Sequence, residues 1–311
     1  MKRTIIFILF CTMAPGLQSQ DQNIQSNLEV YDLETGQHQI VYSEKAHFEA
    51  PNWSPDDTFF LINQSGKIFR IDRETFIKEP IFTGFANQNN NDHGISPDGR
   101  LLAISHMGPP GVPSEQGDWR SSRIYTLPIT GGTPDLVTGN APSFWHSWSP
   151  DGQTLLYTGM RQDDFDIYAI SVGGGTETRL TRTPGLDDGP DFSHDGTFIF
   201  YNSIRSGRME IWKMDCDGKE HHQITDDAYS DWFPHPSPDG RHVVFLSYLE
   251  DQGDRHPPMK EVALRLLDLR DHGIKTLCTF TGGQGTINVP SWSPDGRKFI
   301  FVSYEYIEAN K

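Results

Sequence analysis

The chain has 311 residues, of which 42 are Asp or Glu and 26 are Lys or Arg, so its formal net charge at pH 7 is −16. This excess of negative charge argues against binding to duplex nucleic acid or to an anionic membrane surface, because both need a basic face. Beyond residue 19 the cysteines are Cys216 and Cys278, which are too few for a disulfide scaffold and lack the spacing of a zinc motif.

Residues 1–19 have the pattern of a secretory signal peptide. Lys2 and Arg3 precede an apolar run over residues 5–14, and a polar stretch ends near Ser19. The apolar run is too short to span a bilayer, and no other long apolar run follows it. We therefore expect a single domain over residues 20–311 that is exported, does not span a membrane and is a monomer.

The next elements are two strands at residues 26–32 and 38–43, joined by a turn at residues 34–36. A four-residue motif then recurs along the chain: Ser-Pro-Asp-Asp at Ser54, Ser-Pro-Asp-Gly at Ser96, Ser149, Ser237 and Ser293, and Ser-His-Asp-Gly at Ser193. The spacings are 42, 53, 44, 44 and 56 residues. Ser, Pro and Gly at the first, second and fourth positions suit a type I turn. A regular period of this length is typical of a repeat array.

A run of β-branched and aromatic residues follows each turn, as in TLLYTG at residues 154–159. A third strand comes next, as in FDIYAISV at residues 165–172, and a turn containing glycine leads to a fourth. No segment has a sustained helical period. Four strands in each of six units predict an all-β fold, a six-bladed β-propeller with four antiparallel strands per blade.

The two ends of the chain support this count. After Ser293 there is room for two strands, the second being KFIFVSYEY at residues 298–306. The strands at residues 26–32 and 38–43 supply the missing pair. We therefore expect the last blade to be closed by the N-terminal strands, which would remove the exposed sheet edges of an open array.

The repeat pattern W-S-P-D-G … I-Y … G-G … L-T resembles the WD40-like (PD40) repeats of the TolB propeller family over residues 50–304. It is most similar to small secreted TolB-like proteins that consist of the propeller alone. TolB itself has an additional α/β domain, for which we expect no room here. The resemblance implies a periplasmic or secreted binding protein whose partner is a protein or an oligosaccharide.

More distantly, the chain resembles the oligogalacturonate lyase propellers, which bind a metal in the central mouth through histidines and a glutamine. That resemblance implies an alternative function, a metal-dependent carbohydrate-active enzyme with a divalent metal as cofactor. The nearest counterparts of the lyase ligands are His93, His146, His235 and Gln284. The match is indirect, because GGQGTIN around Gln284 contains no histidine. The binding function needs no cofactor, and we favour it because a fold does not specify chemistry.

Propeller connectivity places two sets of polar residues at one mouth of the ring. We expect the first set in loops that arrive from the preceding blade, just before each innermost strand: His47, Glu49, Asp92, His93, Trp145, His146, Asp187, Asp188, Trp232, His235 and Asn288. The second set follows the second strand of each blade: His106, Arg161, Arg205, Tyr248, His256, Tyr304 and Glu305. The two longest spacings insert extra residues near this second set, and long loops on a rigid scaffold often carry function.

Each candidate also has a structural interpretation. His93 and His146 occupy a slot that holds proline in four other blades, and this asymmetry favours a site over packing. Asp187 and Asp188 are equally consistent with a general acid–base pair and with the composition of a tight loop. Arg161 and Arg205 are consistent with binding a carboxylate of a ligand and with binding a carboxylate of the protein itself. The ligand-binding set that we predict is His47, Glu49, Asp92, His93, Trp145, His146, Arg161, Asp187, Asp188, Arg205, His235 and Asn288.

Overall fold

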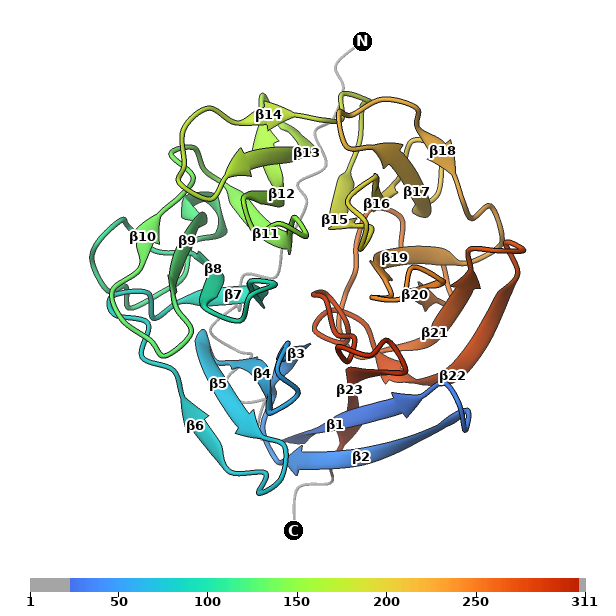
Figure 1. The fold of residues 1–311 in the computed structure, drawn as a ribbon, viewed down its shortest axis with the longest axis horizontal. Coiled ribbons are helices and arrows are strands. Elements are labelled where there is room, and N and C mark those ends of the chain that lie inside the picture. Colours follow the sequence, from blue (N-terminus) through green and yellow to red (C-terminus); the bar gives the residue numbers. More distant parts are fainter. Residues whose placement is uncertain (1–22, 308–311) are drawn as a thin grey trace.

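Six antiparallel β-sheets surround a central axis in the computed structural model, which describes residues 23–307 (Figure 1). The all-β, six-bladed propeller predicted from the repeats is therefore confirmed. No helix among residues 23–307 is long and apolar enough to cross a membrane. The signal peptide expected at residues 1–19 lies outside the described residues.

The blades are numbered in chain order, each from its innermost strand outward. Blade 1 holds β3 (Glu49–Trp53), β4 (Phe59–Gln64), β5 (Lys67–Asp72) and β6 (Lys78–Pro80); blade 2 holds β7 (Asn89–Ile95), β8 (Leu101–His106), β9 (Arg123–Pro128) and β10 (Asp135–Leu136). Blade 3 holds β11 (Ser143–Trp148), β12 (Thr154–Arg161), β13 (Asp164–Ser171) and β14 (Thr178–Arg179); blade 4 holds β15 (Asp187–Phe192), β16 (Phe198–Ser203), β17 (Glu210–Asp215) and β18 (His222–Gln223). Blade 5 holds β19 (Ser230–Pro236), β20 (His242–Tyr248), β21 (Lys260–Asp268) and β22 (Ile274–Gly282); blade 6 holds β23 (Lys298–Tyr306), β1 (Ile24–Asp32) and β2 (Gln37–Glu44).

The recurring Ser-Pro-Asp-Gly motif forms the turn between the first and second strands of a blade. At Ser149, the hydroxyl donates to Asp151 at 2.5 Å and accepts from the backbone N–H of Thr154 at 2.9 Å. The N–H of Gly152 donates to the carbonyl of Ser149 at 2.8 Å, and Gly152 has a φ of 69°. These bonds hold the two strands in register at a position where glycine avoids strain. The motif is therefore explained by turn geometry.

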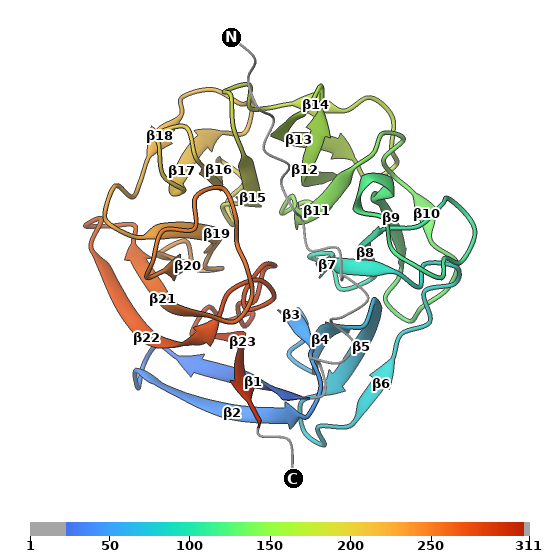
Figure 2. The same ribbon diagram turned by 180° about the vertical axis from the view of Figure 1, so that it is seen from behind.

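Blade 6 joins the two ends of the chain. Strand β1 pairs with β23 in an unbroken register from Ile24 opposite Tyr306 to Asp32 opposite Lys298, and β2 lies outside β1, as both views show (Figure 2). The prediction that N-terminal strands close the last blade is therefore confirmed. The expected innermost strand of this blade is reduced to one bridge, between Trp292 and Phe299. Pro290 has no N–H to offer to a strand ladder at this point.

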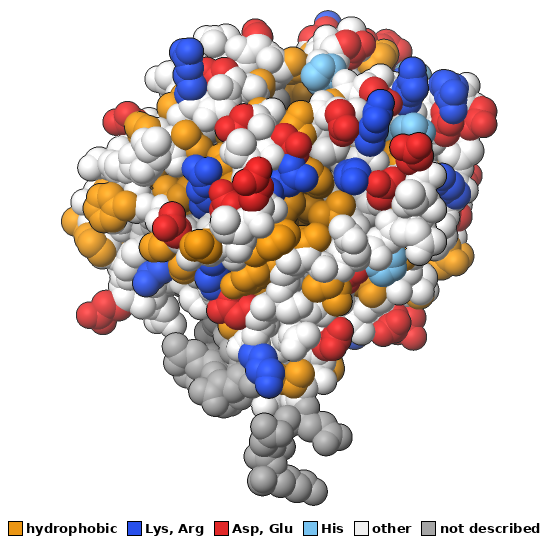
Figure 3. Space-filling model, turned by 60° about the horizontal axis from the view of Figure 1, so that its bottom comes forward, with side chains coloured by type: hydrophobic (Ala, Val, Ile, Leu, Met, Phe, Trp, Pro, Cys, Tyr) orange, Lys and Arg blue, Asp and Glu red, His pale blue; other side chains and the backbone are white. Residues whose placement is uncertain are grey.

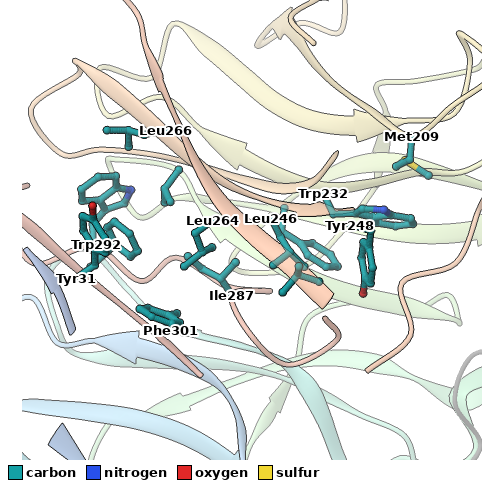
Figure 4. Close-up of a cluster of buried hydrophobic side chains, with 14 of the residues drawn as sticks. Tyr31, Met209, Trp232, Leu246, Tyr248, Leu264, Leu266, Ile287, Trp292 and Phe301 are labelled. Carbon is teal, nitrogen blue, oxygen red and sulfur yellow. The ribbon is translucent and has the colours of Figure 1, made fainter. Parts of the chain in front are cut away.

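Large apolar side chains fill the space between neighbouring blades. One cluster joins blades 5 and 6, with Trp232, Leu246 and Leu264 on one side and Ile287 and Phe301 on the other (Figure 4). On the side of the molecule seen in Figure 3, acidic, basic and hydrophobic side chains are interspersed. The apolar contacts between blades, together with the closure at blade 6, hold the ring together.

Removal of residues 26–43 should open the ring. Strand β23 would lose its partner on its outer edge, and the unpaired backbone groups of this edge would be exposed and prone to aggregation. We expect the truncated protein to aggregate or to melt at a much lower temperature, measured by differential scanning calorimetry and light scattering. Ile40→Ala, at a side chain that is 53% exposed on β2, is the control and should leave melting nearly unchanged. A truncated protein with the melting temperature of the intact one would contradict this closure.

Gly94→Ala should destabilise the contact between blades 2 and 3. A Cβ at Gly94 would lie 2.0 Å from the Cη2 atom of Trp145, whose side chain is 1% exposed. We expect unfolding to become easier by about 1–3 kcal/mol, the usual effect of overpacking a core, measured by urea denaturation. Gly139→Ala, where a Cβ would meet nothing within 4 Å, should change stability little. Equal stabilities of the two variants would contradict the proposed packing.

Candidate functional site

The innermost strands begin at the same face of the ring, which we call the mouth. The residues expected in arriving loops lie in these strands instead: Trp145 and His146 belong to β11, and Asp92 and His93 belong to β7. The strands extend further because each continues past a β-bulge, such as the register shift between Trp145 and Ser147. A bulge adds an unpaired residue and redirects its side chain. In β11 that residue is His146.

The same bulge recurs in other blades. The register shifts between Asn89 and His93, between Asp188 and Asp191, and between Trp232 and His235. The bulged segments also contain residues with positive φ, namely Ala50, Gly189 and Phe233 at 55°, 59° and 53°. Such conformations are strained for Ala and Phe, so surrounding packing must hold them. The repeated bulge therefore brings side chains from different blades towards the axis.

His146 and Asp188 form a buried pair across blades 3 and 4. The Nε2 atom of His146 is 3.1 Å from Oδ1 of Asp188, and the Thr158 hydroxyl donates to the same oxygen at 2.7 Å. Burial opposes the charged form of His146, but the hydrogen bond to Asp188 and the charges of Asp92 and Asp188 raise its pKa overall. Burial also opposes the charge on Asp188, yet the contact with His146 lowers the Asp188 pKa to about 2. The contact therefore favours the charged form of both partners, an imidazolium and a carboxylate.

Asp92 adds a second carboxylate from blade 2. Its side chain is buried and is bonded to the amide of Asn90. Burial raises the pKa of Asp92 to about 7, and the charges of Asp188 and Glu49 act in the same direction while His146 acts against them. Asp92 is thus a carboxyl group that loses its proton near neutral pH.

A long loop of blade 5 covers these residues. Residues 249–259 carry His256, whose Nε2 is 3.8 Å from Oδ2 of Asp188 and whose ring lies 4.7 Å from that of Trp232. We call Asp92, His146, Asp188 and His256 the mouth cluster. The predicted ligand-binding set omitted His256; the signal for it was the 56-residue spacing, which inserts a histidine-bearing loop over the mouth.

Blades 1 and 6 complete the surroundings of the cluster. Glu49 accepts from the side-chain amide of Asn91 at 3.4 Å, and His47 stacks on Tyr304 at 5.2 Å. The side chain of Asn288 accepts from the N–H of Gly285 at 2.7 Å and donates to Gln284 at 3.2 Å. With Glu49 and Asn288, all six blades therefore contribute side chains to the mouth.

Other predicted site residues have partners elsewhere in the fold. Nδ1 of His93 contacts the carbonyl of Asn91 at 3.0 Å, and burial lowers the pKa of His93 to about 4. His235 contacts Asp191 at 2.9 Å and the carbonyl of Ile287 at 2.7 Å. These contacts tie both histidines to the segments at the axis, and no ion pair or hydrogen bond described within residues 23–307 joins their side chains to those of the mouth cluster.

The two predicted arginines are each paired within one blade. Arg161 makes two 2.8 Å bonds to Glu177, and Arg205 lies 3.3 Å from both carboxylate oxygens of Asp187. Trp145 is enclosed between blades 2 and 3 against Gly94. These residues support the ring, so we do not include them in the mouth cluster.

The four expected metal ligands do not form a metal site. Both ring nitrogens of His235 are engaged by Asp191 and a backbone carbonyl, and Nδ1 of His93 is engaged by its own strand. Within residues 23–307, no group of three or more His, Cys, Asp or Glu side chains is arranged to hold a metal ion. The residues present therefore do not fit the metal implied by the lyase resemblance.

A separate hollow lies at the opposite face, where the Ser-Pro-Asp-Gly turns meet. Its volume is about 250 Å³, and it is lined by aromatic and proline side chains that include Trp53, Trp148, Phe192, Trp292, Pro150 and Pro294. The indole N–H groups of Trp148 and Trp292 donate to backbone carbonyls at 3.1 and 2.8 Å. These indoles are thus used in joining blades. No residue of the mouth cluster lines this hollow.

The buried pair predicts a distinctive titration. His146 should remain protonated above its ordinary pKa of 6.5, and Asp188→Asn should lower its pKa by removing the counter-ion. Because the folded pKa is raised, this contribution to stability is complete below about pH 6.5 and is lost as the pH rises through the folded value. NMR titration of the histidine ring protons in the wild type and in Asp188→Asn measures this. A wild-type His146 pKa at or below its ordinary value of 6.5 would contradict the pairing.

Comparison with known proteins relates this chain to a protein family. The model of the TolB beta propeller domain (PD40) matches residues 118–305. An uncharacterized protein of Agrobacterium fabrum is 46% identical over 287 residues, which cover 92% of this chain and 94% of that protein. The Tol-Pal system protein TolB of Bordetella pertussis is 45% identical over 53 residues, which are 17% of this chain and 12% of that protein.

Solved structures give the same result. A structure from Agrobacterium tumefaciens, provisionally assigned as TolB, is 46% identical with a TM-score of 0.85 and covers 91% of this chain and 99% of that one. An oligogalacturonate lyase in complex with manganese has a TM-score of 0.52 at 12% identity, with 87% of this chain and 70% of that one covered, and this likeness concerns the fold alone. The family match and the long alignment at 46% identity show that the chain belongs to the TolB β-propeller (PD40) family.

Proposed function

We propose that the protein is a periplasmic, TolB-like binding module that receives a partner protein at its mouth. The observation that carries this proposal is the mouth cluster, in which blades 2, 3 and 4 each place a buried charged side chain beside the axis. Burying such groups is unfavourable unless partners compensate them. A ring that gathers them at one entrance is better suited to a ligand than to stability.

A protein partner fits the breadth of this face. Two long connections overhang the mouth, residues 107–122 in blade 2 and residues 249–259 in blade 5, so a large surface surrounds the central cluster. Loops held by a rigid scaffold are common binding surfaces. The name of the Bordetella relative, a Tol-Pal system protein, also supports an envelope assembly role. A periplasmic location further rests on the signal pattern of residues 1–19.

The alternative, a metal-dependent carbohydrate-active enzyme, is less well supported. The lyase likeness concerns the fold, and a fold alone does not determine an activity. His235, which that mechanism would need as a ligand, has both ring nitrogens engaged by Asp191 and a backbone carbonyl. The experiment below therefore includes manganese and oligogalacturonate as probes of this alternative.

Site-specific photo-crosslinking distinguishes the two faces of the ring. A photoreactive residue at Glu250, exposed in the overhanging loop, should form a discrete adduct with a partner protein in intact cells. The matched position is Asp151, exposed in a turn at the opposite face, which should give little adduct. Asp188→Asn should reduce the Glu250 adduct several-fold, because it removes a charge at the centre of the mouth.

Three outcomes would contradict this function. Equal adducts from Glu250 and Asp151 would remove the preference for the mouth, and an adduct indifferent to Asp188→Asn would remove the cluster from binding. Cleavage of oligogalacturonate by the purified protein with added manganese, lost in His93→Ala, would support the enzyme instead.

A further inference from the structure

The loop of residues 249–259 reaches the mouth through one side chain. The ring of His256 packs against the adjacent rings of Trp232 and Phe233, at 4.7 and 5.4 Å between ring centres, and its Nε2 is 3.8 Å from Asp188. At 3.8 Å the contact with Asp188 is longer than a good hydrogen bond. His256 therefore occupies the space beside Asp188 without forming a tight ion pair.

The loop backbone beside His256 is closely seated. The hydroxyl of Tyr248 donates to the carbonyl of Pro257 at 2.8 Å. A Cβ at Gly283, whose φ is 117°, would lie 2.2 Å from the same carbonyl oxygen, so this approach requires glycine. Further along the loop, the hydroxyl of Ser230 donates to Asp251 at 2.7 Å. These polar contacts hold the loop over the mouth.

The side chains around His256 are mainly acidic. Three carboxyl groups, Glu49, Asp92 and Asp188, lie with the imidazole of His146 in this part of the mouth. Burial lowers the pKa of His256 and so disfavours a positive charge on this imidazole. The space that it fills is thus a position where a cation would be stabilised.

A buried polar atom at the mouth also has no hydrogen-bond partner within residues 23–307. It is the hydroxyl of Tyr304, in a residue that is 2% exposed. This hydroxyl lies beside Glu49, since a Cβ at Gly285 would approach both within 2.8 Å. Buried polar groups in folded proteins are usually satisfied, so this hydroxyl indicates a binding partner that completes the site.

We infer that the mouth cluster is a subsite for the ammonium or guanidinium group of a lysine or arginine side chain on the partner, and that His256 fills this subsite in the free protein. The inference rests on the proposed function and specifies its chemistry. The incoming cation pairs with Asp188 and Asp92 while His256 and its loop move away. The groups that face the cation are Glu49, Asp92, His146, Asp188 and Tyr304.

Binding of a blocked Gly-Lys-Gly peptide tests the subsite directly. His256→Ala should bind this peptide about tenfold more tightly than the wild type, because the site no longer has to open. Asp188→Asn in the His256→Ala background should abolish the gain, and a blocked Gly-Glu-Gly peptide should not bind. His222→Ala, at an exposed histidine on the outer strand β18, is the matched control and should behave as the wild type.

His256→Lys provides an independent test that does not depend on loss of packing. The new ammonium should reach Asp188 from within the chain, raise the melting temperature by a few degrees at pH 7 and block the lysine peptide. Asp188→Asn should cancel both effects. A His256→Lys protein that is no more stable than His256→Ala, together with unchanged peptide affinity in His256→Ala, would overturn the inference.

These results separate the inference from the proposed function. If Glu250 forms its Asp188-dependent adduct but His256→Ala and His256→Lys have no effect, the partner binds at the mouth and the subsite inference is wrong. If the peptide results are as expected but Glu250 forms no adduct, the subsite exists and the protein-binding function is wrong.

Discussion

The antiparallel pairing of β1 with β23 is the interaction on which the rest of the molecule depends. It joins residues near opposite ends of the chain over nine consecutive pairs, from Ile24–Tyr306 to Asp32–Lys298. Each blade otherwise contacts its sequence neighbours, so without this pairing the blades would form an open array with two exposed edges. Closure also fixes the distance from every innermost strand to the axis. The mouth exists as a shared space because the ring is closed.

The β-bulges determine what occupies that space. A regular strand would direct alternate side chains at neighbouring blades, and the extra residue in β11 turns His146 towards Asp188 of the next blade instead. Their different environments then give two buried carboxyl groups different pKa values. The hydrogen bond to His146 lowers the pKa of Asp188, whereas Asp92 has no such bond to an imidazole and burial raises its pKa. A repeated backbone feature has thereby produced a site without symmetry.

The fold could be predicted from the sequence, because turn-forming residues and strand composition depend on short stretches of sequence and recur six times. The repeat also placed His146 and Asp188 at the same mouth, since both precede equivalent turns in adjacent blades. Contacts between segments far apart in the sequence could not be predicted from it. The spacing of residues could not show that His235 is held by Asp191 and Ile287, or that His256 is inserted beside Asp188 by a loop. The sequence did not predict the bulges for the same reason, because an unpaired residue does not change the hydrophobic pattern of a strand. The strands were therefore expected to begin later than they do.

The pairing of Ile24 with Tyr306 has a practical consequence for handling the protein. Both residues lie at the mouth end of their strands, as the stacking of His47 on Tyr304 shows. A surface linker attached next to Ile24 or Tyr306 would therefore lie beside the mouth. An anchor placed in an exposed turn such as the one at Asp151 would hold the ring by its other side and leave the mouth facing the solution. The orientation of the immobilised molecule, and with it any sensor-surface measurement, depends on this choice.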